Sequence, residues 1–141
     1  MEATEPQDRG VPQVMLHRLR SNEDAPRAAR ELIEEMLVHV EGHAPERRDD
    51  LILCVSELVA NAVVHGAPGY LTVQIETSGS GVRVEVGDDG VNPFSWPERL
   101  NSYGHWGLNL VKRMSDRAGI DRRPWTVAWC EFDLAQQSRS G

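Results

Sequence analysis

The chain has 141 residues, a length typical of one domain that can bury a real core. Hydrophobic residues make up 40% and charged residues 26%, which suits a soluble globular protein. The formal net charge of −7 argues against general nucleic-acid binding, although an anionic small ligand needs only local donors.

No apolar run approaches the length of a membrane span, and the first residues, Met1 to Pro6, are acidic and unlike a signal peptide. We therefore expect a cytoplasmic protein with no membrane partner and no direct nucleic-acid partner. Cys54 and Cys130 lack metal-ligand spacing and are most simply reduced core residues. Lys112 is the only lysine, and no Gly-Lys-Ser/Thr sequence is present, so a Walker-type P-loop is excluded.

The first part of the chain predicts a tail, a strand and a helix. Residues 1–13 are polar and are expected to form a flexible tail, and residues 14–19 alternate weakly like a strand. The cluster at residues 21–24, followed by Pro26, predicts the start of a helix that runs to about Val40. The expected buried face of this helix is Ala29, Leu32, Ile33, Met36, Leu37 and Val40.

The middle of the chain predicts a helix and a hairpin. Pro45 begins a second helix, which Gly66 and the following Ala-Pro-Gly should end. Tyr70–Glu76 alternates clearly like a strand, and residues 78–81 form a turn into a second strand over 82–86.

The last part of the chain predicts a long loop, a helix and a strand. The segment from Val91 to Tyr103 contains two prolines and two aromatic residues, and is interpreted as a lid, with a small satellite core as the alternative. A helix should then begin near Gly104 and end near Gly119, and residues 126–134 should form the final strand.

The element order β-α-α-β-β-α-β predicts an α+β fold. It fits a two-layer α/β sandwich with the helices on one face of a mixed sheet. We expect one domain over residues 14–134, with flexible tails at residues 1–13 and 135–141.

The second helix carries a polar stripe in an otherwise apolar segment. Glu57, Asn61 and His65 recur every four residues, which places them on one side of a helix, and Asp50 falls on the same side. A carboxylate followed four residues later by a carboxamide offers a general base beside a hard oxygen ligand suited to Mg²⁺. The alternative is the solvated side of an amphipathic helix.

Two later motifs favour the chemical interpretation. Asp88-Asp-Gly90 follows a half-buried strand, and Gly104-His-Trp-Gly-Leu108 opens a helix. In this order, Glu-x-x-x-Asn, Asp-x-Gly and Gly-x-x-Gly-Leu resemble the N box and two glycine boxes of the GHKL, or Bergerat-fold, ATPases. The resemblance runs from about Leu16 to Leu134.

The resemblance implies an ATP site with Mg²⁺. Asp88 would accept a hydrogen bond from the adenine amino group, and Gly90 would let the backbone approach the ring. The helix start at the second glycine box would bind the phosphates. Asn61 would coordinate Mg²⁺, and Glu57 would orient and deprotonate the attacking hydroxyl. The residues implied to bind the nucleotide are Asn61, Asp88, Gly90, Gly104, His105, Gly107 and Leu108.

Three polar residues near this site could have either a functional or a purely structural role. His65 matches a histidine that often closes the N box, and a hydrogen bond at the helix end explains it equally well. Lys112 and Arg113 could supply positive charge to the phosphates, but a solvated helix face is the simpler interpretation.

Within this superfamily the chain most closely resembles the single-domain anti-sigma-factor serine/threonine kinases. This branch implies ATP-dependent phosphorylation of a small anti-anti-sigma (STAS-type) protein and binding of a sigma factor, and leaves a homodimer open. The first glycine box departs from the pattern because Val91-Asn-Pro93 follows Gly90. The second glycine box departs as well, since His105-Trp106 is closer to some histidine kinases. The alternatives are therefore a non-catalytic ATP-binding partner-switching module and the catalytic module of a two-component histidine kinase.

Overall fold

The computed structural model describes residues 12–40, 42, 44–66, 69–88, 104–121 and 127–135. The described elements are β1 (Gln13–Arg20), α2 (Ala25–Leu37), α3 (Pro45–His65), β2 (Tyr70–Ser78), β3 (Gly81–Asp88), α4 (Gly104–Met114), β4 (Arg117–Asp121) and β5 (Val127–Asp133). Most of each expected tail and the whole of the expected lid, residues 91–103, lie outside the described residues. None of the helices in the described ranges is both long and apolar enough to cross a bilayer.

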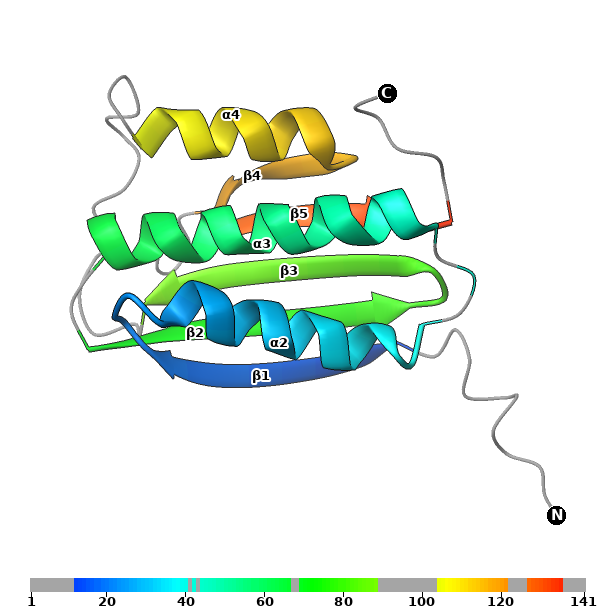
Figure 1. Cartoon of the computed structure of the whole chain (residues 1–141), viewed down its shortest axis with the longest axis horizontal. Coiled ribbons are helices and arrows are strands. Elements are labelled where there is room, and N and C mark those ends of the chain that lie inside the picture. Colours follow the sequence, from blue (N-terminus) through cyan, green and yellow to red (C-terminus); the bar gives the residue numbers. More distant parts are fainter. Residues whose placement is uncertain are drawn as a thin grey trace, which may run out of the picture.

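The described elements form two layers, as the α+β prediction requires. Figure 1 shows α2, α3 and α4 on one face of the sheet, and no described element covers the opposite face. We call this opposite face the open face of the sheet. The longest helix, α3, lies over the middle of the sheet and packs against β3 and β5. It also packs against α2 and α4, so it contacts both layers.

The sheet has the strand order β1-β2-β3-β5-β4, and every described strand pair is antiparallel. The expectation of a mixed sheet is therefore wrong. A helix that joined β3 directly to the final strand beside it would make a parallel crossover. The additional strand β4 reverses the chain once more after α4, so β5 enters beside β3 in the antiparallel direction.

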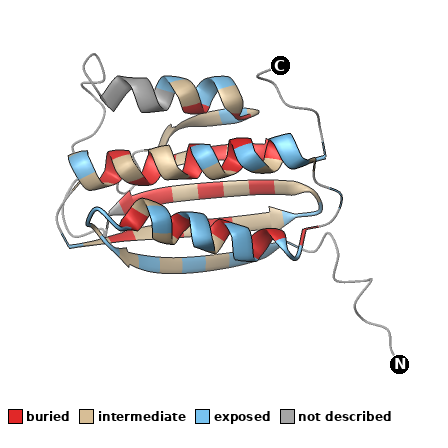
Figure 2. Ribbon diagram, viewed as in Figure 1, coloured by how far each residue is buried: buried red, intermediate tan, exposed pale blue. Residues whose placement is uncertain are grey.

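The core fills the space between the helices and the inner face of the sheet (Figure 2). The buried positions of β2, β3 and β5 alternate with half-buried ones, as expected for strands with one covered face. Six residues were predicted to form the buried face of the first helix. Four of them are buried and lie within α2: Ala29, Ile33, Met36 and Leu37. Leu32 is half-buried and packs against the core, and Val40 is buried just beyond the helix end.

Two helix ends differ from the sequence predictions. Helix α2 ends at Leu37, three residues before Val40. Helix α4 ends at Met114, and Gly119, expected to end a helix, lies inside β4. Helix α4 begins at Gly104, as predicted, so Gly107 lies in its first turn. The second helix and the β2–β3 hairpin begin and end close to their predicted positions.

The two cysteines are free and buried, which confirms their assignment as core residues. Burial, followed by the charge of Asp50, raises the pKa of the Cys54 thiol to about 12. Burial likewise raises the pKa of Cys130 well above its ordinary value. Both thiols are therefore protonated at neutral pH and poor nucleophiles.

Candidate functional site

Helix α3 holds the polar stripe at a fixed place over the sheet. It begins at Pro45, a residue suited to a first helical turn, with Glu46 favourably placed near the positive end of the helix dipole. It ends where the Gly66 N–H donates to the Ala62 carbonyl at 2.8 Å. Gly69, with φ of 114°, then turns the chain into β2 in a conformation that favours glycine.

Asn61 is the polar residue of the stripe that the structure distinguishes most clearly. It is only 9% exposed, although it lies near the end of a helix whose neighbours Val64 and His65 are exposed and half-buried. Its Nδ2 atom is buried and has no hydrogen-bond partner among the described residues. A buried amide without a partner costs free energy, so this position does not fit the solvated side of an amphipathic helix.

Glu57 lies one helical turn before Asn61 and is half-buried. Its charge raises the pKa of the neighbouring Cys54 thiol, as a smaller contribution after burial and Asp50. A half-buried carboxylate beside a buried amide can accept a proton or hydrogen bond and still be reached from solution.

The structure brings the three sequence motifs to one end of the molecule. Figure 1 shows the carboxyl end of α3, the end of β3 and the beginning of α4 at the same side of the fold. Asp88 is the last residue of β3 and stands opposite Leu71 of β2 in the ladder. Segments far apart in the chain thus lie at the same end of the fold.

For several of the predicted site residues, the structure describes the position of the backbone alone. Gly104, His105, Gly107 and Leu108 form the first turns of α4, whose free N–H groups and dipole suit an anion. Gly90 lies outside the described residues. Lys112 and Arg113 are exposed in the last turn of α4, which favours the interpretation as a solvated helix face.

Asp50 shares the side of α3 that carries Asn61 but belongs to another cluster. Eleven residues of helix separate the two, roughly 16 Å along the axis. Asp50 is buried and lies 3.8 Å from the Nη1 atom of Arg47. Arg47 also pairs with Asp116 at 2.7 Å and donates to the Met114 carbonyl at 3.1 Å. These residues fasten the opposite end of α3 to the end of α4, and sequence analysis did not predict their pairing.

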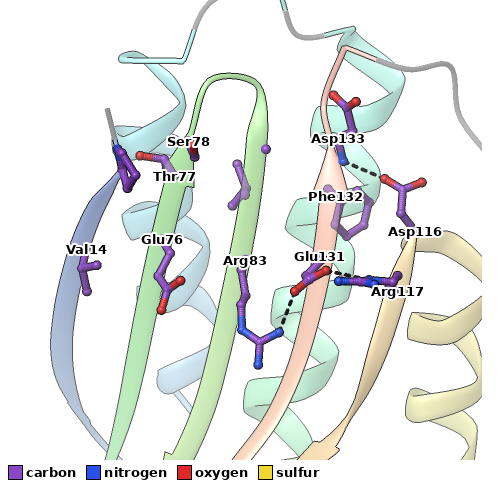
Figure 3. A pocket seen from close by; sticks show the side chains of 13 residues that line it. Val14, Glu76, Thr77, Ser78, Arg83, Asp116, Arg117, Glu131, Phe132 and Asp133 are labelled. Carbon is purple, nitrogen blue, oxygen red and sulfur yellow. Dashed lines mark hydrogen bonds and ion pairs between the residues drawn. The ribbon is translucent and has the colours of Figure 1, made fainter. Parts of the chain in front are cut away.

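An open hollow of about 600 Å³ lies at that opposite end, on the open face around the β2–β3 hairpin (Figure 3). None of the predicted site residues lines it. Both arginines that line it are paired with carboxylates: Arg83 contacts Glu131 at 2.6 Å and the neighbouring Glu85 at 2.8 Å, and Arg117 contacts Glu131 at 2.9 Å. Because these charges compensate locally, the hollow offers no surplus of donors for a polyanionic ligand.

Comparison with known families identifies the family of the fold. The family described as the histidine kinase-like ATPase domain matches residues 19–127, a range that includes all three motifs. The chain belongs to the histidine kinase-like ATPase domain family. No curated protein sequence matches it significantly.

A solved structure shows the same fold as this ATPase-family chain. The RsbU and RsbW domains of Rv1364c from Mycobacterium tuberculosis superpose with a TM-score of 0.65 at 23% sequence identity. The match covers 90% of this chain and 34% of that one, so this chain spans about a third of the solved protein. The likeness confirms the GHKL-type ATPase fold that the motifs indicate.

A histidine kinase-like ATPase domain implies ATP binding, usually with Mg²⁺, and the chemistry of the Asn61 side chain fits the metal. The buried Nδ2 atom of Asn61 has no hydrogen-bond partner among the described residues, and the oxygen of the same amide is a hard ligand suited to Mg²⁺. The described residues contain no cluster of three or more His, Cys, Asp or Glu side chains suited to a metal. A Mg²⁺ ion here would therefore take most of its ligands from phosphate and water, as Mg²⁺ commonly does.

Proposed function

We propose that this protein is an ATP-dependent serine/threonine protein kinase that phosphorylates a small anti-anti-sigma partner of the STAS type. The observation that carries the proposal is the Glu57–Asn61 pair on α3, inside the region matched by the ATPase family. Asn61 is buried, and its Nδ2 atom has no hydrogen-bond partner among the described residues. The kinase branch comes from the sequence resemblance. The fold shared with a solved RsbW domain is compatible with that branch.

In this proposal each residue of the stripe has a separate task. Asn61 holds Mg²⁺, which neutralises the charge of the phosphates when bound. Glu57 accepts the proton of the attacking serine or threonine hydroxyl and orients its oxygen toward the γ-phosphate. His65, at the end of α3, either contacts a phosphate or hydrogen-bonds near the helix end.

The remaining residues bind the nucleotide. Asp88, at the end of β3, accepts a hydrogen bond from the adenine amino group, and Gly90 allows close approach of the ring. The first turn of α4 binds the phosphates through its N–H groups. The proposed nucleotide-binding residues are Asn61, Asp88, Gly90, Gly104, His105, Gly107 and Leu108.

Such a kinase would act in the cytoplasm and bind a sigma factor when its STAS-type partner is absent. Two other functions use the same fold. A partner-switching module would bind ATP without transferring phosphate, and a histidine kinase module would transfer it to a histidine. These functions differ in the fate of the γ-phosphate.

Phosphate transfer from labelled ATP tests the proposal. The full chain is mixed with γ-labelled ATP, Mg²⁺ and candidate STAS-type proteins, and the labelled residue is mapped. Acid-stable label on a partner serine or threonine supports the kinase, and acid-labile label on a histidine indicates the histidine kinase module. ATP binding without transfer to any candidate indicates a non-catalytic module.

Glu57→Gln is the matched control for transfer. It preserves size and hydrogen bonding but cannot accept a proton, so transfer should fall roughly 10²–10⁴-fold while ATP binding is kept. Glu57→Gln that transfers phosphate at the wild-type rate would exclude Glu57 as the base.

A further inference from the structure

The outward face of helix α3 is apolar in its second half, where a surface helix normally carries charged side chains. Leu53, Ala60 and Val64 fall within roughly 40° of one another around the helix axis, since successive residues are about 100° apart. Leu53 is 39% and Val64 72% exposed, and Ala60 is half-buried. Between Leu53 and Val64 the only charged residue is Glu57.

The neighbouring helix α2 shows the usual pattern of a surface helix. Helices α2 and α4 lie on either side of α3 (Figure 1). The exposed residues of α2 are all charged: Arg27, Arg30, Glu31, Glu34 and Glu35. The first half of α3 is similar, with Glu46 and Asp49 exposed. The apolar outward face is therefore a local feature of the second half of α3.

This apolar surface is continuous with the Glu57–Asn61 pair. Glu57 lies roughly 20° from Val64 around the helix axis, and Asn61 lies about 40° further toward the core. These angles agree with a half-buried Glu57 and a buried Asn61. Along the axis, Leu53 is about 6 Å from Glu57 in one direction and Val64 about 10 Å in the other. Glu57 thus lies between two exposed apolar side chains.

The proposed role of Glu57 limits where a protein substrate can lie. A general base must come within about 3 Å of the hydroxyl oxygen that it deprotonates, so the segment carrying that hydroxyl has to lie against this part of α3. A stable protein contact covers roughly 800 Å² of each partner, a patch about 30 Å across. A contact centred on Glu57 therefore also covers Leu53 and Val64.

We propose that Leu53, Ala60 and Val64 form the surface on which the protein substrate docks, and that this surface selects an acceptor serine or threonine flanked by apolar side chains. The inference rests on the proposed kinase function and adds the chemistry of its substrate. Apolar contacts on both sides hold the hydroxyl over Glu57 and exclude water from it. A segment with charged residues beside the hydroxyl is a poor substrate, because those charges lose their hydration against an apolar surface.

Steady-state phosphate transfer tests the docking surface. The probe is the STAS-type protein to which the wild-type chain transfers phosphate from ATP most rapidly, and the variant is Leu53→Ser/Val64→Ser. The KM for this probe should rise at least about tenfold, with kcat and ATP affinity nearly unchanged, because the variant loses binding surface and no reacting group. The control is Val38→Ser, since Val38 is 78% exposed just beyond the end of α2. An unchanged KM in the folded double variant would overturn the inference.

The same assay separates failure of this inference from failure of the proposed function. Wild-type protein that transfers phosphate to no candidate, or to a histidine only, would overturn the kinase and this inference with it. Wild-type transfer rates in the double variant, at every probe concentration, would overturn this inference alone.

The mapped acceptor of the probe tests the predicted substrate chemistry. Apolar residues should lie within about three positions on both sides of it, since an extended chain advances about 3.3 Å per residue. Replacing them with aspartate should lower transfer at least about tenfold, because their contacts with α3 are lost. An acceptor flanked by charged residues, or full transfer after these replacements, would overturn the inference.

Chemical labelling tests the surface without relying on a loss of apolar area. Cys54 and Cys130 are buried, so a maleimide should react with the exposed thiol of a Val64→Cys or Val38→Cys protein. Fluorescein maleimide should lower transfer by the Val64→Cys protein at least about tenfold, because it displaces the substrate, and should leave the Val38→Cys protein unchanged. ATP binding should persist in both. Equal transfer by the two labelled proteins, or loss of ATP binding in the labelled Val64→Cys protein, would overturn the inference.

A second copy of the chain is the other occupant that these variants distinguish. A wild-type dimer in sedimentation that dissociates in the Leu53→Ser/Val64→Ser variant, but not in Val38→Ser, would assign the surface to self-association. That result would overturn the inference, whereas the same oligomeric state in all three proteins supports it.

Discussion

The Nη2 atom of Arg47 and the Oδ2 atom of Asp116 lie 2.7 Å apart, and the Arg47 side chain is fully buried. The same carboxylate oxygen accepts the Asp133 N–H at 2.6 Å, and the guanidinium carbon lies 4.7 Å from the Phe132 ring centroid. One ion pair therefore joins α3, the end of α4 and β5. It fixes α3 at one end, while Glu57 and Asn61 lie toward the other.

Replacing Arg47 should destabilise the fold strongly. Arg47→Met leaves the carboxylates of Asp50 and Asp116 without their shared cation, which should cost about 3–5 kcal/mol in urea denaturation. The control is Arg48→Met, because Arg48 pairs with Asp49 at the surface and its loss should cost less than about 0.5 kcal/mol. Equal stability of the two variants would show that the buried pair does not hold α3.

The side chain of Trp129 on β5 leaves no room for a side chain at Gly119 of β4. It stands opposite Trp129, and a Cβ atom at this position would lie 3.0 Å from the indole ring. The Arg83 guanidinium carbon also lies 4.2 Å from the Trp129 ring centroid, so the ring has little room to move. Gly119→Ala should therefore cost about 1–3 kcal/mol of stability.

A double-mutant cycle separates this contact from a general effect on the strand. With Trp129→Phe as background, the smaller ring relieves the clash, so Gly119→Ala should cost clearly less. Thermal unfolding of the four proteins measures both costs. The same cost in both backgrounds would mean that Trp129 is not what requires a glycine.

Glu131 should make stability depend on pH in the acid range. Burial alone would raise its pKa, but hydrogen bonds from Arg83 and Arg117 lower the pKa below its ordinary value. A carboxylate with a lowered pKa in the folded state stabilises the fold above its unfolded pKa. That contribution is lost as the pH falls through its folded pKa.

Comparing wild type with Glu131→Gln reveals this contribution. The difference in unfolding free energy should be full above about pH 5 and should shrink steadily as the pH falls below about 4.3. Urea denaturation at several pH values measures it. A difference that stays constant through this range would show that the two arginines do not stabilise the charged form of Glu131.

Local signals predicted most of the fold. Pro45 and Gly66 bound α3, and strict alternation around a Ser-Gly turn gave β2 and β3. Strand β4 escaped prediction because five residues with a charge at each end and Gly119 in the middle show no clear period. Its glycine is explained only by Trp129, which comes ten residues later and meets it across the ladder.

The site was predictable only in part, for the same reason. The spacing of Glu57 and Asn61 placed them on one side of a helix, but spacing could not show that Asn61 is buried and Glu57 half-buried. Sequence analysis did not single out Arg47, because its partner Asp116 is 69 residues away. Long-range pairing of this kind leaves no local pattern in a sequence.

The central claim is that Asn61 supplies the protein ligand for Mg²⁺ in an ATP site. Calorimetric titration of ATP into wild type and Asn61→Ala, with Mg²⁺ and with EDTA, tests it most directly. We expect tight binding to wild type with Mg²⁺, markedly weaker binding to folded Asn61→Ala with Mg²⁺, and nearly equal binding of both without metal. Equal Mg-ATP affinity of the two folded proteins, or no ATP binding by wild type, would contradict the account.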